Sequence, residues 1–290
     1  MEFRKLLDMP DDLVSAEQPV LLLALMWCGI YGLLLIIVRY KLQSMIRAYP
    51  LSYPESLVSK AASFANNGTS IVNAFICCVA GGTCMYLLSS SPSSVQIEGP
   101  IPEKLFFFFW SFMGFLLYDI VYELVLCDHA LDWPIIAHHF VYLLVTATLY
   151  ADSSMVLLTG VLVSQEVSTL FLNCMQIMRS VNQTEGMFYT VNAIALTVTF
   201  FVFRLIGPAI ALGQLFLYSP GGFLHGKRIF LLTLVSLGYC MQAFWFGKIL
   251  KGMIKHIWSE NVQEEIAPLL DPDLAAGGMT DNQTQKQTTI

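Results

Sequence analysis

The segment LFFFFWSFMGFLLYDIVYELVL (residues 105–126) decides the fold class, because it is apolar along most of its length. A helix needs about 20 such residues to cross the hydrocarbon core of a bilayer. Comparable stretches occur at about residues 18–38, 70–90, 135–151, 155–178, 188–214 and 229–250. A chain in lipid must satisfy its backbone polar groups within each span, so all seven spans are predicted to be helices.

The composition leads to the same fold class. The 15 basic and 21 acidic residues make up only 12% of the chain, whereas 56% is hydrophobic and the mean hydropathy is +0.64. A soluble domain carries about 25% charged residues. The low charge excludes a soluble enzyme, a secreted disulfide module and a nucleic-acid binder. We therefore predict an all-α, polytopic membrane protein with about seven transmembrane helices and no nucleic-acid partner.

Basic residues beside the spans predict the orientation, because Lys and Arg are enriched in cytosolic flanks. The segment after the first span and the end of the last span are the richest in Lys and Arg, and they share a side only if the number of spans is odd. We therefore expect a luminal N-terminus and a cytosolic C-terminus. The predicted organisation is a luminal segment (1–17), a first helix with a basic cytosolic loop (18–59), a six-helix membrane domain (60–255) and a disordered acidic cytosolic tail (256–290).

Several polar side chains lie inside the predicted spans, where each is costly unless it is paired or faces water. They come from four successive helices and carry both signs of charge. We expect them to turn inward around one central cavity. They are Asp119 in the third span, His138, His139 and Tyr142 in the fourth, Glu166, Thr169 and Asn173 in the fifth, and Arg204 in the sixth.

This cluster allows more than one interpretation. It could line a lipid-binding pocket, or it could be a buried ion-pair network that fixes the packing of the helices. It could also be catalytic, with His138 or His139 as general base and a carboxylate such as Asp119 or Glu166 orienting the ring. A metal site is not predicted, because neighbouring histidines on a helix diverge by about 100°. No G-x-S-x-G motif occurs, which excludes the usual serine hydrolases.

The order of these residues resembles a known family. Gly114-x4-Asp119 is followed by the pair His138-His139, by Gln165-Glu166-Val167-Ser168 with Phe171 and Asn173, and by Phe203-Arg204. The sequence is similar in this respect to the TLC-domain family, which includes ceramide synthases and translocating-chain-associated membrane proteins. The resemblance covers about residues 60–255. It implies a barrel-like helical bundle around a lipid-accessible cavity, typically in the endoplasmic reticulum.

The chain departs from the ceramide synthases of that family at the residues expected to be catalytic. Those enzymes carry HHxxT followed by His-Asp-x-x-Asp. Here Tyr142 replaces the Thr and Gln165 replaces the later His, while Glu166 and Thr169 replace the two Asp residues. The resemblance therefore implies a divergent member that is not a ceramide synthase and is closer to members linked to membrane lipid composition.

The C-terminal tail carries a candidate sorting signal. Glu265, separated by three residues from Leu269 and Leu270, has the form of an acidic dileucine motif. A sorting adaptor is therefore a predicted partner of the tail. The resemblance favours the endoplasmic reticulum, and the dileucine form leaves an endosomal, lysosomal or vacuolar membrane as the alternative.

The leading prediction is a role in membrane lipid homeostasis, in which the chain binds, senses or transports a lipid without a cofactor. The first alternative is an acyl-CoA-dependent N-acyltransferase of ceramide-synthase type, with His138 and His139 catalytic and acyl-CoA as co-substrate. The second alternative is a trafficking or structural membrane adaptor.

Overall fold

The structure, a computed structural model, describes residues 13–48, 56–89, 103–126, 131–152, 156–217 and 226–270. Within these ranges the chain forms helices and no strand. Five helices are long and apolar enough to cross a membrane, namely Val20–Ala48, Ala61–Tyr86, Phe106–Val125, Met187–Gly213 and Ile229–Trp258. The predicted fold class, an all-α polytopic membrane protein, is therefore confirmed.

Two π-helical segments, η1 and η2, interrupt the α-helical pattern of the described residues. The elements are α2 (Leu13–Ala48), α3 (Ser56–Ser59), α4 (Ala61–Ser89), α6 (Glu103–Val121), η1 (Tyr122–Leu126), α7 (Trp133–Asp152), α8 (Val156–Ser164), α9 (Val167–Ser180), α10 (Met187–Phe200), η2 (Phe201–Ile206), α11 (Gly207–Leu217) and α12 (Gly226–Leu270).

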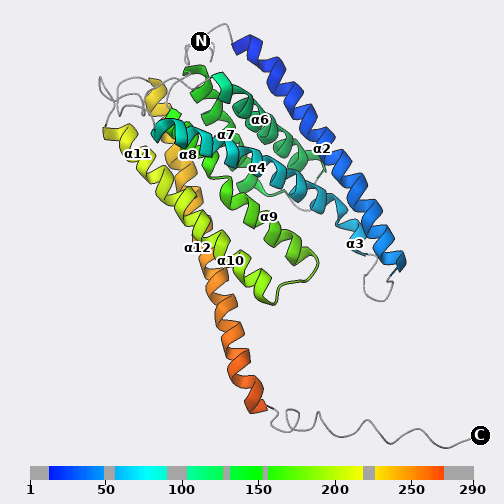
Figure 1. Cartoon of the computed structure of the whole chain (residues 1–290). Helices are drawn as coiled ribbons and strands as arrows, with labels where there is room; N and C mark the ends of the chain where they lie inside the picture. Colours follow the sequence, from blue (N-terminus) through cyan, green and yellow to red (C-terminus); the bar gives the residue numbers. More distant parts are fainter. Residues whose placement is uncertain are drawn as a thin grey trace, which may run out of the picture.

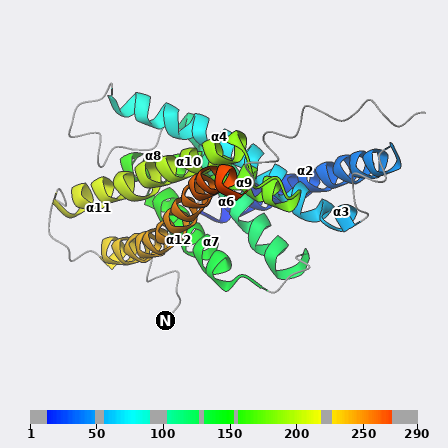
Figure 2. The same cartoon turned by 90° about the horizontal axis from the view of Figure 1, so that it is seen from below.

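The helices form a closed ring with one helix outside it. Around the ring α4 packs against α6, α6 against α7, α7 against α12, α12 against α10, α10 against α9, and α9 against α4. Helix α2 packs against α4 and α6 and lies at the outer edge of the bundle (Figures 1 and 2). The ring therefore encloses an interior space to which α2 has no direct access.

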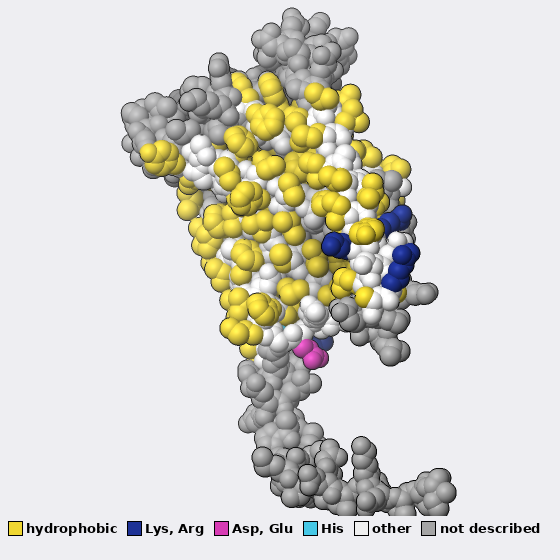
Figure 3. All heavy atoms as spheres, turned by 45° about the vertical axis from the view of Figure 1, so that its right-hand side comes forward, with side chains coloured by type: hydrophobic (Ala, Val, Ile, Leu, Met, Phe, Trp, Pro, Cys, Tyr) yellow, Lys and Arg dark blue, Asp and Glu magenta, His cyan; other side chains and the backbone are white. Residues whose placement is uncertain are grey.

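The surface of the bundle divides into an apolar belt and a basic end. Figure 3 shows hydrophobic side chains over most of the visible face, with Lys and Arg gathered toward the lower end. The Lys60 ammonium donates to the Ser180 carbonyl at 2.8 Å, which places the start of α4 and the end of α9 at this same end. The basic end is the one that we predict to be cytosolic.

Three predicted spans differ from the helices observed. The predicted span 155–178 is divided into α8 and α9 by a turn at Gln165 and Glu166. Helix α4 begins at Ala61, nine residues before the predicted start at residue 70, because polar Asn66, Asn67 and Ser70 lower the hydropathy of its first turns. Helix α12 continues to Leu270, so residues 256–270, expected to be disordered, are helical.

Gly114 lets α6 approach α2 closely. A Cβ atom built on Gly114 would lie 2.9 Å from the backbone nitrogen of Ala24 and 3.1 Å from the carbonyl carbon of Leu23. At the same crossing, Trp27 of α2 is fully buried, and its indole donates to the Ser111 carbonyl of α6 at 3.0 Å. The glycine of the Gly114-x4-Asp119 motif is therefore explained by helix packing.

We predict that Gly114→Ala destabilises the protein, because the new methyl group meets the backbone of α2 and forces the helices apart. Overpacking of this kind costs about 1–3 kcal/mol. The measurement is the thermal unfolding midpoint of the purified chain in detergent. Gly82→Ala is the control, since a Cβ at Gly82 has no atom within 4 Å; an equal midpoint for the two variants would contradict the assignment.

Candidate functional site

The ring encloses a cavity of about 330 Å³ that is lined by residues of α4, α6, η1, α7, α9, α10, η2 and α12. All eight residues of the predicted cluster line this cavity. Asp119, Asn173 and Arg204 are buried, and so is His138. The sequence therefore identified residues that the fold brings together, while their function stays a prediction.

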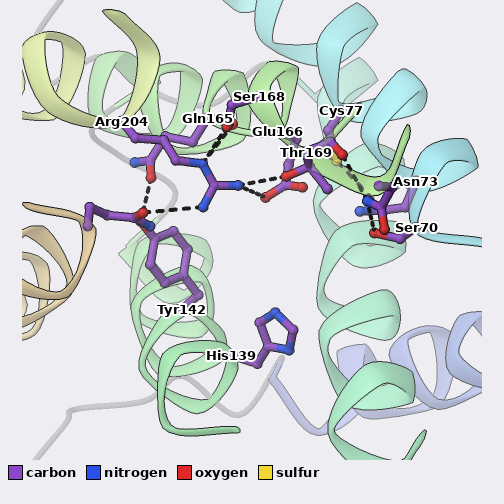
Figure 4. Close-up of polar contacts among 12 residues, drawn as sticks. Ser70, Asn73, Cys77, His139, Tyr142, Gln165, Glu166, Ser168, Thr169 and Arg204 are labelled. Carbon is purple, nitrogen blue, oxygen red and sulfur yellow. Dashed lines mark hydrogen bonds and ion pairs between the residues drawn. The ribbon is translucent and has the colours of Figure 1, made fainter. Parts of the chain in front are cut away.

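Arg204 lies in η2, and its side chain contacts the turn that separates α8 from α9. Its Nε donates to the Ser168 hydroxyl at 2.6 Å and to the Gln165 carbonyl at 3.2 Å, and its Nη2 donates to the Thr169 hydroxyl at 2.6 Å (Figure 4). A continuous helix would direct the Gln165 carbonyl toward the amide of Thr169. In the structure the Thr169 amide donates instead to the backbone carbonyl of Glu166, at 3.0 Å.

The guanidinium also connects the carboxylate and amide side chains around it. Its Nη2 lies 3.7 Å from Glu166 Oε1, and its Nη1 donates to Gln242 Oε1 at 3.3 Å. The Gln242 amide donates to the Tyr142 hydroxyl at 3.3 Å, and that hydroxyl donates to Gln165 Oε1 at 2.5 Å. Tyr142 and Gln165, two departures from the ceramide-synthase pattern, therefore belong to one network centred on Arg204.

The second charge pair lies across the cavity. Nδ1 of His139 on α7 lies 2.9 Å from Oδ2 of Asp119 on α6, and both side chains are largely buried. The contact with the carboxylate fixes the orientation of the imidazole ring. Among the described residues no three His, Cys, Asp or Glu side chains gather as ligands of a metal ion would.

His138 sits between aromatic side chains. Its ring centroid lies 4.4 Å from that of Tyr142 and 5.0 Å from that of Trp245. The side chain is 8% exposed, and its Nδ1 has no hydrogen-bond partner among the described residues. A buried polar atom without a partner is costly. A ligand that offers a hydrogen bond to Nδ1 would remove that cost.

Within the one cavity expected from the sequence, the charges form two pairs, Asp119 with His139 and Glu166 with Arg204. Asn173 of the polar stripe donates to the Ser70 hydroxyl at 3.0 Å and so connects α9 to α4.

The cavity residues contributed by α12 and by the first turns of α4 were not predicted from the sequence. They are Asn66, Asn67 and Ser70 on α4, and Trp245, Lys248 and Ile249 on α12. Gln242, which bonds Arg204, was not predicted either. A lone Gln within an apolar span was a usable signal, because a neutral amide in a bilayer also needs a partner.

The geometry defines a class of protein: a multi-pass membrane protein in which a ring of helices surrounds a polar cavity. The model of the TLC domain matches residues 63–251, which extend from α4 to α12 and leave out α2. The chain therefore belongs to the TLC-domain family, and the ring around the cavity is its TLC domain. No curated protein matches the sequence at a significant level.

We predict that Arg204→Met lowers stability by about 3–5 kcal/mol, because it leaves the Glu166 carboxylate buried without its cation. The thermal midpoint in detergent measures the loss. Lys255→Met, which removes an exposed cation from α12, is the control. The double variant Arg204→Met with Glu166→Gln should recover part of the loss, and a double variant less stable than Arg204→Met would contradict the role of the pair.

Proposed function

We propose that this TLC-domain protein binds a membrane lipid in the central cavity and acts in membrane lipid homeostasis by sensing or transporting that lipid. The observation that supports the proposal is the convergence of eight polar residues on one cavity within a membrane-spanning ring. A volume of about 330 Å³ lies within the range of small-molecule sites, about 300–1,000 Å³.

The walls of the cavity suit a molecule with one polar and one apolar part. Phe112, Leu116 and Leu172 contribute apolar surface, whereas the two charge pairs and His138 contribute polar surface. A lipid polar group would contact the side chains of α7, and its chain would lie along the apolar walls. This arrangement buries the chain in an environment like the bilayer and gives specificity to the polar end.

The hydrogen-bonding groups still available determine which polar group fits. Arg204 uses all three of its guanidinium nitrogens in contacts with the protein. On the α7 side, Nδ1 of His138 has no hydrogen-bond partner among the described residues. Asp119 contacts His139 through Oδ2, which leaves its other carboxylate oxygen for a ligand. The proposed ligand therefore carries a hydroxyl or amide that hydrogen-bonds to His138 and Asp119.

The acyltransferase remains the second candidate because of one observation. A carboxylate 2.9 Å from an imidazole, as in Asp119 and His139, is the arrangement that orients a general base. Against it, Glu166 and Thr169 contact Arg204 and Gln165 bonds Tyr142. These side chains replace the His and Asp residues of the synthases and are engaged in holding the fold, which favours lipid binding without acyl transfer.

For location we propose the endoplasmic reticulum, on the strength of the family, with an endosomal, lysosomal or vacuolar membrane as the alternative.

The adaptor function would depend on Glu265, Leu269 and Leu270. Their backbone belongs to the end of α12, and their side chains lie outside the described residues. Recruitment of a sorting adaptor by the tail stays a prediction, separate from the lipid site.

We predict that the purified chain retains a defined lipid and that His139→Ala loses most of it, because the variant removes a polar group from the cavity. Mass spectrometry of co-purifying lipids measures the amount per protein. Phe140→Ala is the matched control, since Phe140 is the next residue on α7 but is 54% exposed and does not line the cavity. Equal lipid content in wild type, His139→Ala and Phe140→Ala would contradict the proposal.

We also predict no acyl transfer from a long-chain acyl-CoA to a sphingoid base by the purified chain, because the synthase side chains at Gln165 and Thr169 are missing. The measurement is product formation by mass spectrometry with the wild type and His138→Ala. Acyl transfer by the wild type that is abolished by His138→Ala would establish the acyltransferase in place of the proposed function.

A further inference from the structure

A second cavity of about 180 Å³ lies between α9, α10 and α12 at the basic end of the bundle. Arg179, Lys248 and His256 bring basic side chains to its wall, while Leu196 and Met253 contribute apolar surface. Liquid water occupies about 30 Å³ per molecule, so this space exceeds that of a few waters. The cavity is large enough for a polar headgroup of modest size.

The second cavity adjoins the central one. Leu172, Lys248 and Ile249 line both cavities. Two of the three shared residues are aliphatic, so the boundary between the cavities is apolar on the side of Leu172 and Ile249. A molecule with a charged group in the second cavity can therefore extend an apolar chain toward the central cavity.

Two cations of the second cavity have no acidic partner among the described residues. Arg179 donates through Nε to the Tyr189 hydroxyl at 2.9 Å, and Lys248 Nζ lies 4.4 Å from the centroid of the Phe244 ring. Glu185, in the connection between α9 and α10, lies outside ion-pair distance of both. Both positive charges are thus available to an anion.

Cations beside a span are common at the cytosolic end and indicate orientation only. Lys251 and Lys255 of α12 are cations of that ordinary kind, because they line neither cavity, although all four cations are exposed. Arg179 and Lys248 differ from them because they come from separate helices and line one cavity. This convergence is what indicates a binding site.

The start of α10 adds to the positive potential. This helix begins at Met187, and Tyr189 in its first turn lines the cavity. The N-terminal end of a helix dipole favours a nearby anion. Met187 and Phe188 are 81% and 90% exposed, as expected of apolar side chains that enter the membrane interface. The second cavity would then lie at the depth of the lipid headgroups.

We propose that the second cavity binds a phosphate group carried by a lipid whose apolar chain extends into the central cavity. This inference rests on the proposed function and adds a chemical class to the lipid. Two cations without an acidic partner and a nearby helix N-terminus suit a phosphate group. Hydrogen bonds from a cation to a phosphate oxygen are stronger than those between neutral groups. The Tyr189 hydroxyl, which accepts from Arg179, fixes the guanidinium at the cavity wall.

The test compares two lipids with identical chains on the purified full-length protein. The probes are dioleoyl phosphatidic acid and dioleoylglycerol, and the readout is the ratio of their dissociation constants in neutral detergent. We expect the wild type to prefer phosphatidic acid at least tenfold. The double variant Arg179→Gln with Lys248→Gln should lose that preference, whereas the matched pair Lys251→Gln with Lys255→Gln should keep it.

Each outcome decides the inference. A preference that survives in Arg179→Gln with Lys248→Gln would overturn it, and so would an equal loss in both pairs, since general electrostatic attraction would then explain the data. Displacement of phosphatidic acid by millimolar inorganic phosphate would show that the site takes the free ion and would overturn a site for a lipid phosphate. Specific binding of both lipids without a preference would refute this inference alone, whereas no specific binding of either lipid would refute the proposed function as well.

Discussion

The structure depends on one buried cation, the guanidinium of Arg204. An ionised side chain at this depth is tolerated only when protein groups replace its water. The break between α8 and α9 supplies the Gln165 carbonyl, and the following turn supplies Ser168 and Thr169. The π-helical segment η2 holds Arg204 opposite that break. The irregular backbone on the two sides of this contact therefore has one common cause, and π-helical segments are frequent at functional sites.

This use of Arg204 determines which part of the cavity can act on a ligand. The network satisfies Glu166, Gln165 and Tyr142 and so fixes the wall formed by α8, α9 and α12. The opposite wall, on α7, keeps His138 and His139 at the cavity. Three of the departures from the synthase pattern, Gln165, Glu166 and Thr169, lie on the fixed wall, whereas the fourth, Tyr142, lies on α7 and joins the same network. Gln165, Glu166 and Thr169 thus support the fold, and the two histidines line the other side of the cavity.

The sequence predicted the fold class and the cavity residues for the same physical reason. In a chain with few charges, ionisable residues such as Asp119 and Arg204 within apolar spans are easy to find, and lipid forces them inward. It did not predict the break at Gln165, because the hydropathy of residues 155–178 continues across it. The sequence also did not predict that Lys248 lines the cavities or that Gln242 bonds Arg204. Both contacts depend on where α12 packs within the ring.

The basic groups of the two cavities differ in their protein contacts. Arg204 contacts a carboxylate and neutral acceptors through all three nitrogens, so a ligand could engage it only by displacing contacts that hold α8 and α9 in place. Arg179 and Lys248 have no acid within ion-pair distance among the described residues. An anion bound there would not have to break an ion pair among the described residues. In the proposed function, the second cavity attracts the anionic group and the central cavity supplies the hydrogen bonds, so one amphipathic lipid would contact both cavities.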